Sequence, residues 1–279
     1  MKELRGTTAV VTGASRGIGV HIARALAKQG VNLALAARSE GELEVVCKEM
    51  AALGVTAIAV KCDVTDAADR ARLIERTEAE LGPIDILVNN AGIETASRFE
   101  MADPDDLVAT IDVNLVAAML LTRALLPGML DRRRGHVVNI ASGAGKVGVP
   151  FAVAYATSKH GLVGFTNSLR CEYLKSPVGF SVVCPGFVTE TGMYARWEER
   201  GAKAPKMVGR STPDKVAQIV IRCIQKNRGD MLVNTPPIRP LLVLIAIAPR
   251  VMPWMMKLLG YTRTFERVTE LADRDAQTR

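Results

Sequence analysis

A tyrosine and a lysine four residues apart could carry out proton transfer. Tyr155 and Lys159 stand in the run Tyr-Ala-Thr-Ser-Lys, and Ser142 precedes the tyrosine by 13 residues. On a helix, side chains at this spacing lie on one face, so the Lys159 ammonium can stabilise a Tyr155 phenolate. A free phenol has a pKa near ~10 and is a poor acid or base at neutral pH. If Ser142 holds an oxygen beside the phenol, the three residues could transfer a proton at a carbonyl or an alcohol.

A glycine-rich segment near the amino end has the context of a phosphate-binding loop. It follows the short apolar run Thr7–Val11 and precedes a helical pattern that stops at Gly30. Glycines allow a tight turn and close approach of a pyrophosphate, and the amino end of the helix offers free N–H groups. The spacing is Gly-x3-Gly-x-Gly, and the predicted contacts are Gly13, Ser15, Arg16, Gly17, Ile18 and Gly19.

The second predicted strand, Val31–Ala37, indicates which dinucleotide would bind. NAD is usually recognised by an acidic residue at this strand end, but here Arg38 and Ser39 follow the strand. Arg16 would face the same space, and two guanidinium groups suit a 2′-phosphate. We therefore expect NADP(H). The alternative is that Arg38 is a solvated loop residue.

Further motifs follow in a fixed order along the chain. They are Asn89-Asn90-Ala91-Gly92, Asn114, Ser142, Tyr155, Lys159 and Pro185-Gly186. Together with the glycine loop, this series resembles the short-chain dehydrogenase/reductase family. The resemblance runs from about Thr7 to about Met193, with a further helix and strand to about Asn234.

The resemblance implies a role for each catalytic candidate. Tyr155 would be the general acid in reduction and the base in oxidation. Lys159 would lower the pKa of Tyr155 and hold the nicotinamide ribose. Ser142 would position the substrate oxygen, and Asn114 would anchor a water that relays protons to Lys159.

The resemblance also implies cofactor contacts. All of these residues lie just after a predicted strand. Asp63 and Val64 would contact the adenine. Asn90, Ala91 and Gly92 would lie below the cofactor, and Pro185, Gly186 and Val188 beside the nicotinamide. One position departs from the family pattern, because Glu190 stands where members often have a threonine that bonds the carboxamide. Thr189, Thr191 or the backbone of Val188 could replace that contact.

Seven apolar, strand-like runs alternate with helical patterns, which predicts a doubly wound α/β fold. The runs are Thr7–Thr12, Val31–Ala37, Thr56–Val60, Ile84–Asn89, His136–Ala141, Phe180–Cys184 and Met231–Asn234. We expect a single Rossmann-like domain over residues 1–279, with a parallel sheet of about seven strands flanked by helices. Its core would span about 5–190 and 213–234.

The segments after Pro185 are less typical of the family. Residues 187–212 would form a mobile lid over the substrate, with Phe187, Met193, Tyr194 and Trp197 as contacts. The apolar tail at about 236–267 is broken by prolines and an arginine, and a spanning helix needs ~20 apolar residues. The tail would either pack over the pocket or a neighbouring subunit, or lie at a membrane surface with a basic rim and load an oily substrate.

Composition limits the remaining possibilities. Five cysteines without a Cys-x-x-Cys pair, and a polar start without a signal peptide, predict a reducing, cytoplasmic location. The net charge is +7 and the pI is about 9.3, which suits phosphates or anionic lipid. Aromatic residues are too scarce to favour nucleic acid, and the three histidines have no metal-ligand spacing. By resemblance, we expect a homodimer or homotetramer that pairs through helices at Asp105–Leu130 and Phe151–Lys175.

These features together predict the NADPH-dependent reduction of a ketone with an apolar body, such as a 3-oxoacyl thioester, a steroid or another lipid-like compound. Two alternatives remain open. The same residues could oxidise a hydrophobic secondary alcohol with NADP⁺, or the protein could bind NADP(H) at a membrane without catalysis.

Overall fold

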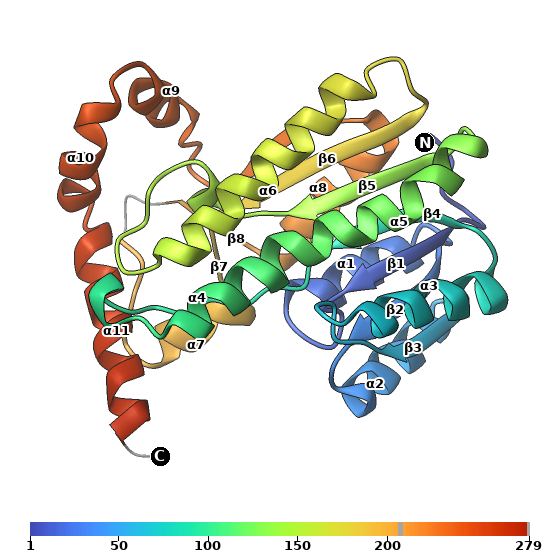
Figure 1. Cartoon of the computed structure of the whole chain (residues 1–279), viewed down its shortest axis with the longest axis horizontal. Helices are drawn as coiled ribbons and strands as arrows, with labels where there is room; N and C mark the ends of the chain where they lie inside the picture. Colours follow the sequence, from blue (N-terminus) through green and yellow to red (C-terminus); the bar gives the residue numbers. More distant parts are fainter. Residues whose placement is uncertain (206–208, 278–279) are drawn as a thin grey trace.

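The structure is a computed structural model that describes residues 1–205 and 209–277, with side chains described as far as residue 271. Its centre is a parallel sheet with the strand order β3-β2-β1-β4-β5-β6-β9 (Figure 1). The strands are β1 (Thr8–Thr12), β2 (Asn32–Ala37), β3 (Ala57–Lys61), β4 (Ile84–Asn89), β5 (Gly135–Ile140), β6 (Val178–Pro185) and β9 (Asp230–Val233). The predicted fold class and all seven predicted strands are confirmed, with boundaries that differ by at most two residues.

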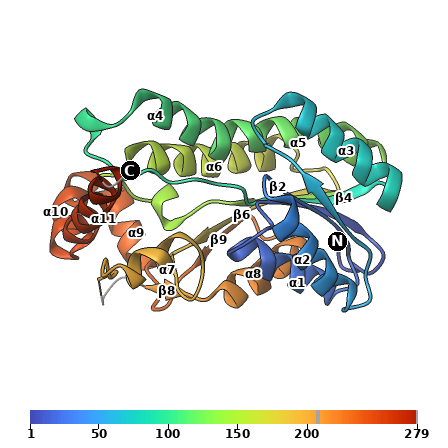
Figure 2. The same ribbon diagram turned by 90° about the horizontal axis from the view of Figure 1, so that it is seen from below.

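Helices cover both faces of this sheet. They are α1 (Ile18–Ala27), α2 (Glu40–Ala51), α3 (Ala67–Leu81), α4 (Pro104–Ile111), α5 (Ala117–Asp131), α6 (Val153–Glu172) and α8 (Pro213–Lys226). Figure 2 shows α1, α2 and α8 on one side and α3, α4, α5 and α6 on the other. The central strands are buried on both faces, which is why they read as continuous apolar runs rather than as alternating ones.

One helical stretch, Pro104–Asp131, is long and apolar enough to cross a membrane by length and composition alone. It is α4 and α5 joined by a π-helical turn at Asp112–Val116. Leu121, Leu125 and Met129 on α5 are buried in the core beside the sheet. The stretch is therefore a core helix in this fold.

The predicted lid contains a short helix, α7 (Gly192–Glu199), and a two-stranded ladder of β7 (Phe187–Val188) and β8 (Arg210–Ser211). Residues 206–208 of the expected lid lie outside the described residues. The predicted tail forms α9 (Arg239–Ile247), a 3₁₀ turn at Pro249–Val251, α10 (Met252–Leu258) and the start of α11 (Tyr261–Gln277). These last helices form a lobe at one end of the molecule (Figure 1).

Candidate active site

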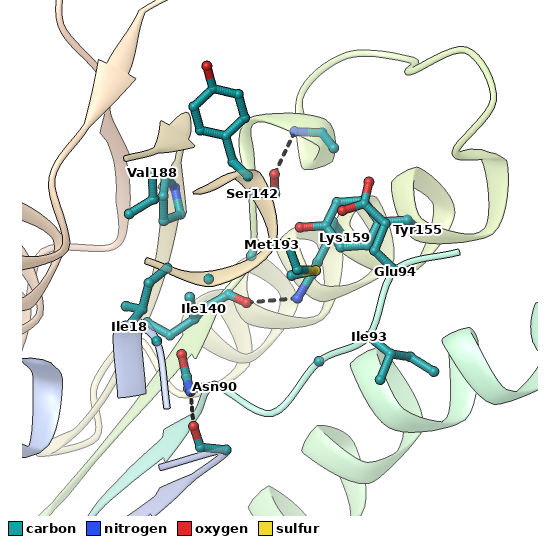
Figure 3. Close-up of a pocket in the computed structure, with 18 of the residues that line it drawn as sticks. Ile18, Asn90, Ile93, Glu94, Ile140, Ser142, Tyr155, Lys159, Val188 and Met193 are labelled. Atoms are coloured by element: carbon teal, nitrogen blue, oxygen red, sulfur yellow. Dashed lines mark hydrogen bonds between the residues drawn. The ribbon is translucent and has the colours of Figure 1, made fainter. Parts of the chain in front are cut away.

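A cavity of about 580 Å³ opens at the carboxyl ends of the parallel strands. The loops after six strands, β1 to β6, deliver the predicted cofactor and catalytic residues to this one edge, as expected for a doubly wound sheet. Every predicted site residue lines the cavity except Gly19 and Asn114, which lie behind its wall. Figure 3 shows Ser142, Tyr155 and Lys159 around the same space.

The glycine loop after β1 can pack against itself and against the end of β4 only because side chains are missing. A Cβ on Gly13 would lie 2.8 Å from the Cα of Ala91, and a Cβ on Gly19 would lie 2.3 Å from the carbonyl oxygen of Gly13. Gly17 precedes α1 with φ of 64°, and no side chain caps the helix there. The first N–H groups of α1 therefore remain for an anion, so this loop fits a pyrophosphate.

Asn90 holds the glycine loop against the end of β4. Its Nδ2 donates to the carbonyl oxygens of Thr12 (2.9 Å) and Gly13 (3.0 Å), while the Thr12 hydroxyl accepts from the backbone N–H groups of Asn90 and Ala91 at 3.0 Å each. These bonds join two adjacent strand ends. Asn90 therefore shapes the cofactor loop in addition to lining the cavity.

Two arginines line the predicted adenosine end of the cavity. Arg16 and Arg38 are exposed, and neither forms a hydrogen bond or ion pair within the described part of the chain. The pKa of the Asp63 carboxyl is lowered, mainly by hydrogen bonds from Thr65. The charge of Arg38 is near enough to contribute to this lowering. Both guanidinium groups are thus available to a phosphate at this end.

The predicted catalytic side chains meet at the other end of the cavity. Tyr155 and Lys159 project from α6, and Ser142 follows β5. Lys159 Nζ donates to the carbonyl oxygen of Ile140 at 3.0 Å and lies 5.6 Å from the centre of the Tyr155 ring. The Ser142 hydroxyl lies close enough to the phenol to act on its pKa, and its Oγ accepts from the N–H of Ala144 at 3.1 Å.

Asn114 makes contacts that the resemblance does not imply. It sits in the π-helical turn between α4 and α5, where its Oδ1 accepts from the N–H of Ile93 at 2.8 Å. Its Nδ2 donates to the Ile93 carbonyl at 2.9 Å and to the Ser158 hydroxyl at 3.0 Å. The side chain thus ties the loop after β4 to α6, and the expected proton relay through a water to Lys159 stays a prediction.

Burial dominates the electrostatics of the pair. Burial, and next the Glu94 carboxylate, raise the pKa of Tyr155 above its ordinary value, while the hydrogen bond from Ser142 acts to lower it. Burial lowers the pKa of Lys159 to about 8, against the opposing effect of Glu94. Desolvation of both groups is the largest effect on their pKa values here, and the lowering of the Tyr155 pKa by Lys159 stays a prediction. The phenol remains protonated at neutral pH, which is the form that donates a proton.

Glu94 is a site residue that the sequence analysis missed. It lines the cavity beside Tyr155 and Lys159 (Figure 3), and burial raises its pKa to about 8 against the opposing charges of Lys159 and Arg196. The available signal was its position two residues after Asn89-Asn90-Ala91-Gly92, at a strand end that was already assigned to the site.

The loop after Pro185 separates the alternatives for the carboxamide contact. Thr189 is engaged in the β7–β8 ladder, since its N–H and hydroxyl bond the carbonyl oxygen of Ser211 at 3.0 and 3.3 Å. Thr191 lines the cavity, as does Val188, whereas Glu190 does not. A second missed residue is Asn234, which lines the cavity and whose side-chain amide is buried with no hydrogen-bond partner within the described residues. Such an orphaned amide suits a polar ligand group at this end.

Aromatic side chains from the lid and the tail enclose the catalytic end. Phe187 lies 4.9 Å from Tyr194 and 6.4 Å from Phe265, between ring centres, and Trp197 meets Phe265 edge-on at 5.6 Å. The Tyr194 hydroxyl accepts from the N–H of Ala204 and donates to Glu198, both at 3.0 Å, so this residue also fastens the lid. The tail therefore covers the pocket, as the first of the two interpretations predicted.

The fold and the site define an α/β protein with a dinucleotide pocket and a Ser-Tyr-Lys group at the sheet edge. The family model for short chain dehydrogenase matches residues 7–201. The chain belongs to the short chain dehydrogenase family.

Individual relatives extend this comparison. Over 248 residues the chain is 42% identical to ketoacyl reductase HetN of Nostoc sp. strain PCC 7120, covering 89% of this chain and 85% of the relative. Among solved structures, a variant of actinorhodin polyketide ketoreductase with NADPH matches with a TM-score of 0.76 and 33% identity, over 84% of this chain and 97% of that one. A metagenomic short-chain oxidoreductase in complex with NADP matches with a TM-score of 0.71 and 35% identity, over 83% and 98% of the two chains.

Proposed function

We propose that this protein is an NADPH-dependent reductase that acts on a ketone with an apolar body. The observation that carries the proposal is the joint presence, in one cavity, of a glycine-rich loop before α1, two arginines without a partner among the described residues, and the Ser142–Tyr155–Lys159 group. The similarity to a ketoacyl reductase and to ketoreductases bound to NADPH or NADP supports the reaction and the cofactor.

The residues fit this cofactor and divide the work between them. The glycine loop and the amino end of α1 would hold the pyrophosphate, and Arg16 and Arg38 the 2′-phosphate. NADPH supplies hydride to the carbonyl carbon when it is bound. Ser142 would orient the carbonyl oxygen, and Tyr155 would give that oxygen its proton. Positioned acid catalysis of this kind contributes roughly 10²–10⁴ in rate.

The state of Tyr155 suits the proton-donating step of reduction. Burial, and next Glu94, raise the pKa of this phenol and keep it protonated, while the same residues run in reverse would serve alcohol oxidation. Lys159, with a pKa of about 8, keeps its ammonium in neutral solution and can restore the proton to Tyr155. The pair is therefore poised to donate a proton near neutral pH.

The walls of the catalytic end indicate the substrate class. Phe187, Met193, Trp197 and Phe265 form an apolar cluster with Tyr155, so a long acyl chain or a fused ring system would lose water on binding. The test is consumption of NADPH with a series of ketones of increasing chain length. We expect kcat/KM to rise with apolar length. Failure to reduce any member of the series, including 3-oxoacyl thioesters and steroids, would contradict the proposal.

The two arginines give a separate test of cofactor choice. Replacing both Arg16 and Arg38 by alanine should raise the KM for NADPH tenfold or more and leave the KM for NADH nearly unchanged, because charge-assisted bonds to a phosphate are worth roughly 1.5–3 kcal/mol each. Arg222→Ala, at an exposed position on α8, is the matched control. Equal losses with both cofactors would remove the arginines from 2′-phosphate recognition.

We also propose that the enzyme is cytoplasmic and forms a homo-oligomer. We further propose that its tail contacts the cytoplasmic face of a membrane. Five unpaired cysteines support a reducing compartment. Exposed apolar side chains along α5, such as Met119 and Leu120, support pairing through that helix. The third part of the proposal depends on the outer surface of the tail.

A further inference from the structure

The tail has two apolar faces, and only the inner one is explained by the pocket. From α9, Leu241 and Leu242 line the cavity, and from α10 so does Met256. The outer face carries five large apolar side chains that are 50–78% exposed, namely Val243, Leu244, Ile247, Trp254 and Leu258. Such a concentration on two adjacent short helices marks an interaction surface.

The charge of this segment indicates what the outer face meets. The 35 residues from 231 to 265 contain no aspartate or glutamate. The cations in this stretch are Arg239, Arg250, Lys257 and Arg263, and all four are exposed. An apolar face with a purely basic rim complements the headgroups and the acyl boundary of an anionic bilayer.

The geometry indicates that the segment lies in one leaflet. The helices Arg239–Ile247 and Pro249–Leu258 are apolar enough to count together as a span, but they are bent by 113° to each other. Nine residues of helix are about 14 Å long, less than half of the roughly 30 Å hydrocarbon core. The pair therefore forms a bent hairpin that can enter the interface and cannot cross the bilayer.

A second copy of the chain fits this outer face less well than an anionic membrane does. In a two-fold symmetric dimer the same patch meets itself, so the four cations of each copy would face those of its partner without any acidic residue of the segment between them. That arrangement is repulsive. An anionic lipid surface supplies the missing negative charge.

We propose that the outer face of α9 and α10 docks on an anionic phospholipid surface, and that the cavity beneath it receives its ketone from that membrane. The two helices connect the outer face to the cavity wall. Their buried residues Ile245, Met255 and Met256 pack on Val147, and Val147 lines the cavity. The outer face and the cavity are thus two sides of one apolar layer, which places a membrane surface next to the substrate pocket. The delivery step rests on the proposed reductase function, whereas the docking step does not.

Vesicle co-sedimentation of the full chain tests docking. The protein should bind vesicles of phosphatidylcholine with phosphatidylglycerol, bind pure phosphatidylcholine vesicles at least about tenfold more weakly, and dissociate as salt is raised. The triple variant Ile247→Ser, Trp254→Ser, Leu258→Ser should lose binding about tenfold or more. The matched control is Val45→Ser, Leu53→Ser, Leu174→Ser, which alters exposed apolar residues elsewhere and should bind as the parent does.

Tryptophan emission provides an independent readout of the same contact. The chain has two tryptophans, so Trp197→Phe leaves Trp254 as the sole emitter. Its emission should shift to shorter wavelength with anionic vesicles and stay unchanged with neutral ones. A parent protein that stays in the supernatant at low salt, or a triple variant that instead breaks a larger oligomer, would overturn docking.

Activity separates delivery from catalysis. The triple variant should reduce a short, water-soluble ketone at the parental rate without vesicles, and should lose severalfold in rate with a long-chain ketone presented in anionic vesicles. Equal rates of parent and variant on the vesicle-borne ketone would overturn delivery. If no ketone is reduced by either protein, the reductase proposal and delivery fail together, while the vesicle-binding result still decides docking.

Discussion

At the scale of single residues, the site places the buried phenol of Tyr155 beside the carboxyl group of Glu94. Burial raises the pKa of the phenol and keeps its proton in place. Tyr155, Lys159 and Glu94 influence one another, so their titrations belong to the group rather than to any one residue. The sequence predicted the tyrosine and the lysine because their spacing is local. It could not predict the influence of Glu94, which arises only when the loop after β4 is placed against α6.

Glu94→Gln should move the alkaline limb of the reduction to lower pH. The Glu94 carboxylate raises the pKa of Lys159, which is about 8, so its removal lowers that pKa and the ammonium is lost earlier as pH rises. Well below pH 8 Glu94 is largely protonated, so parent and variant should have similar rates there. The measurement is kcat against pH for both proteins. Glu100→Gln, an exposed acid in the following turn, is the control, and coincident profiles for all three would show that Glu94 does not act on Lys159.

At the scale of elements, the loops that follow the parallel strands bring site residues that are distant in sequence to the carboxyl edge of the sheet. The strands were predictable because β-branched, apolar runs alternate with helical patterns along the chain. The π-helical turn that carries Asn114 was not, because its hydrogen bonds to Ile93 and Ser158 join segments that are 21 and 44 residues apart in sequence. The tail was predicted to be apolar and broken by prolines, but its two faces depend on the packing of Ile245, Met255 and Met256 against Val147 in the loop after β5.

Gly19→Ala should abolish cofactor binding and destabilise the protein. The added Cβ would lie 2.3 Å from the Gly13 carbonyl oxygen and 2.8 Å from Asn90 Nδ2, so the loop that shapes the phosphate site must shift. We expect the Kd for NADPH to rise 100-fold or more, measured by the change in its fluorescence on binding. Gly41→Ala, in α2 with open space around it, is the control and should be neutral or stabilising by up to ~1 kcal/mol. Unchanged affinity in the Gly19 variant would show that the loop does not bind the phosphates.

At the scale of the whole molecule, exposed apolar side chains gather on two faces, the outer face of the tail and the face of α4, α5 and α6. On the second face Val108, Val116, Met119, Leu120 and Val153 are 36–59% exposed. This surface accounts for the apolar composition of the stretch Pro104–Asp131, whose other side packs on the sheet. It is the surface through which we expect two copies to pair.

Met119→Glu with Leu120→Glu should therefore convert the assembly to monomers. A two-fold contact would place the new carboxylates of both copies against each other in an apolar interface, which is costly. Sedimentation velocity should show the smaller species, with a dimer Kd raised 100-fold or more. Val45→Glu, on the opposite side of the sheet, should leave the assembly intact. A double variant that sediments like the parent would place the subunit contact elsewhere.

The central claim is that Tyr155 donates a proton to a ketone beside bound NADPH, and Tyr155→Phe tests it most directly. The variant keeps the ring and its packing with Phe265, so its Kd for NADPH should match that of the parent. Its rate of NADPH consumption with the best ketone should fall by about 10² or more, since only the proton donor is lost. Parental turnover by a variant that binds NADPH normally would contradict the account.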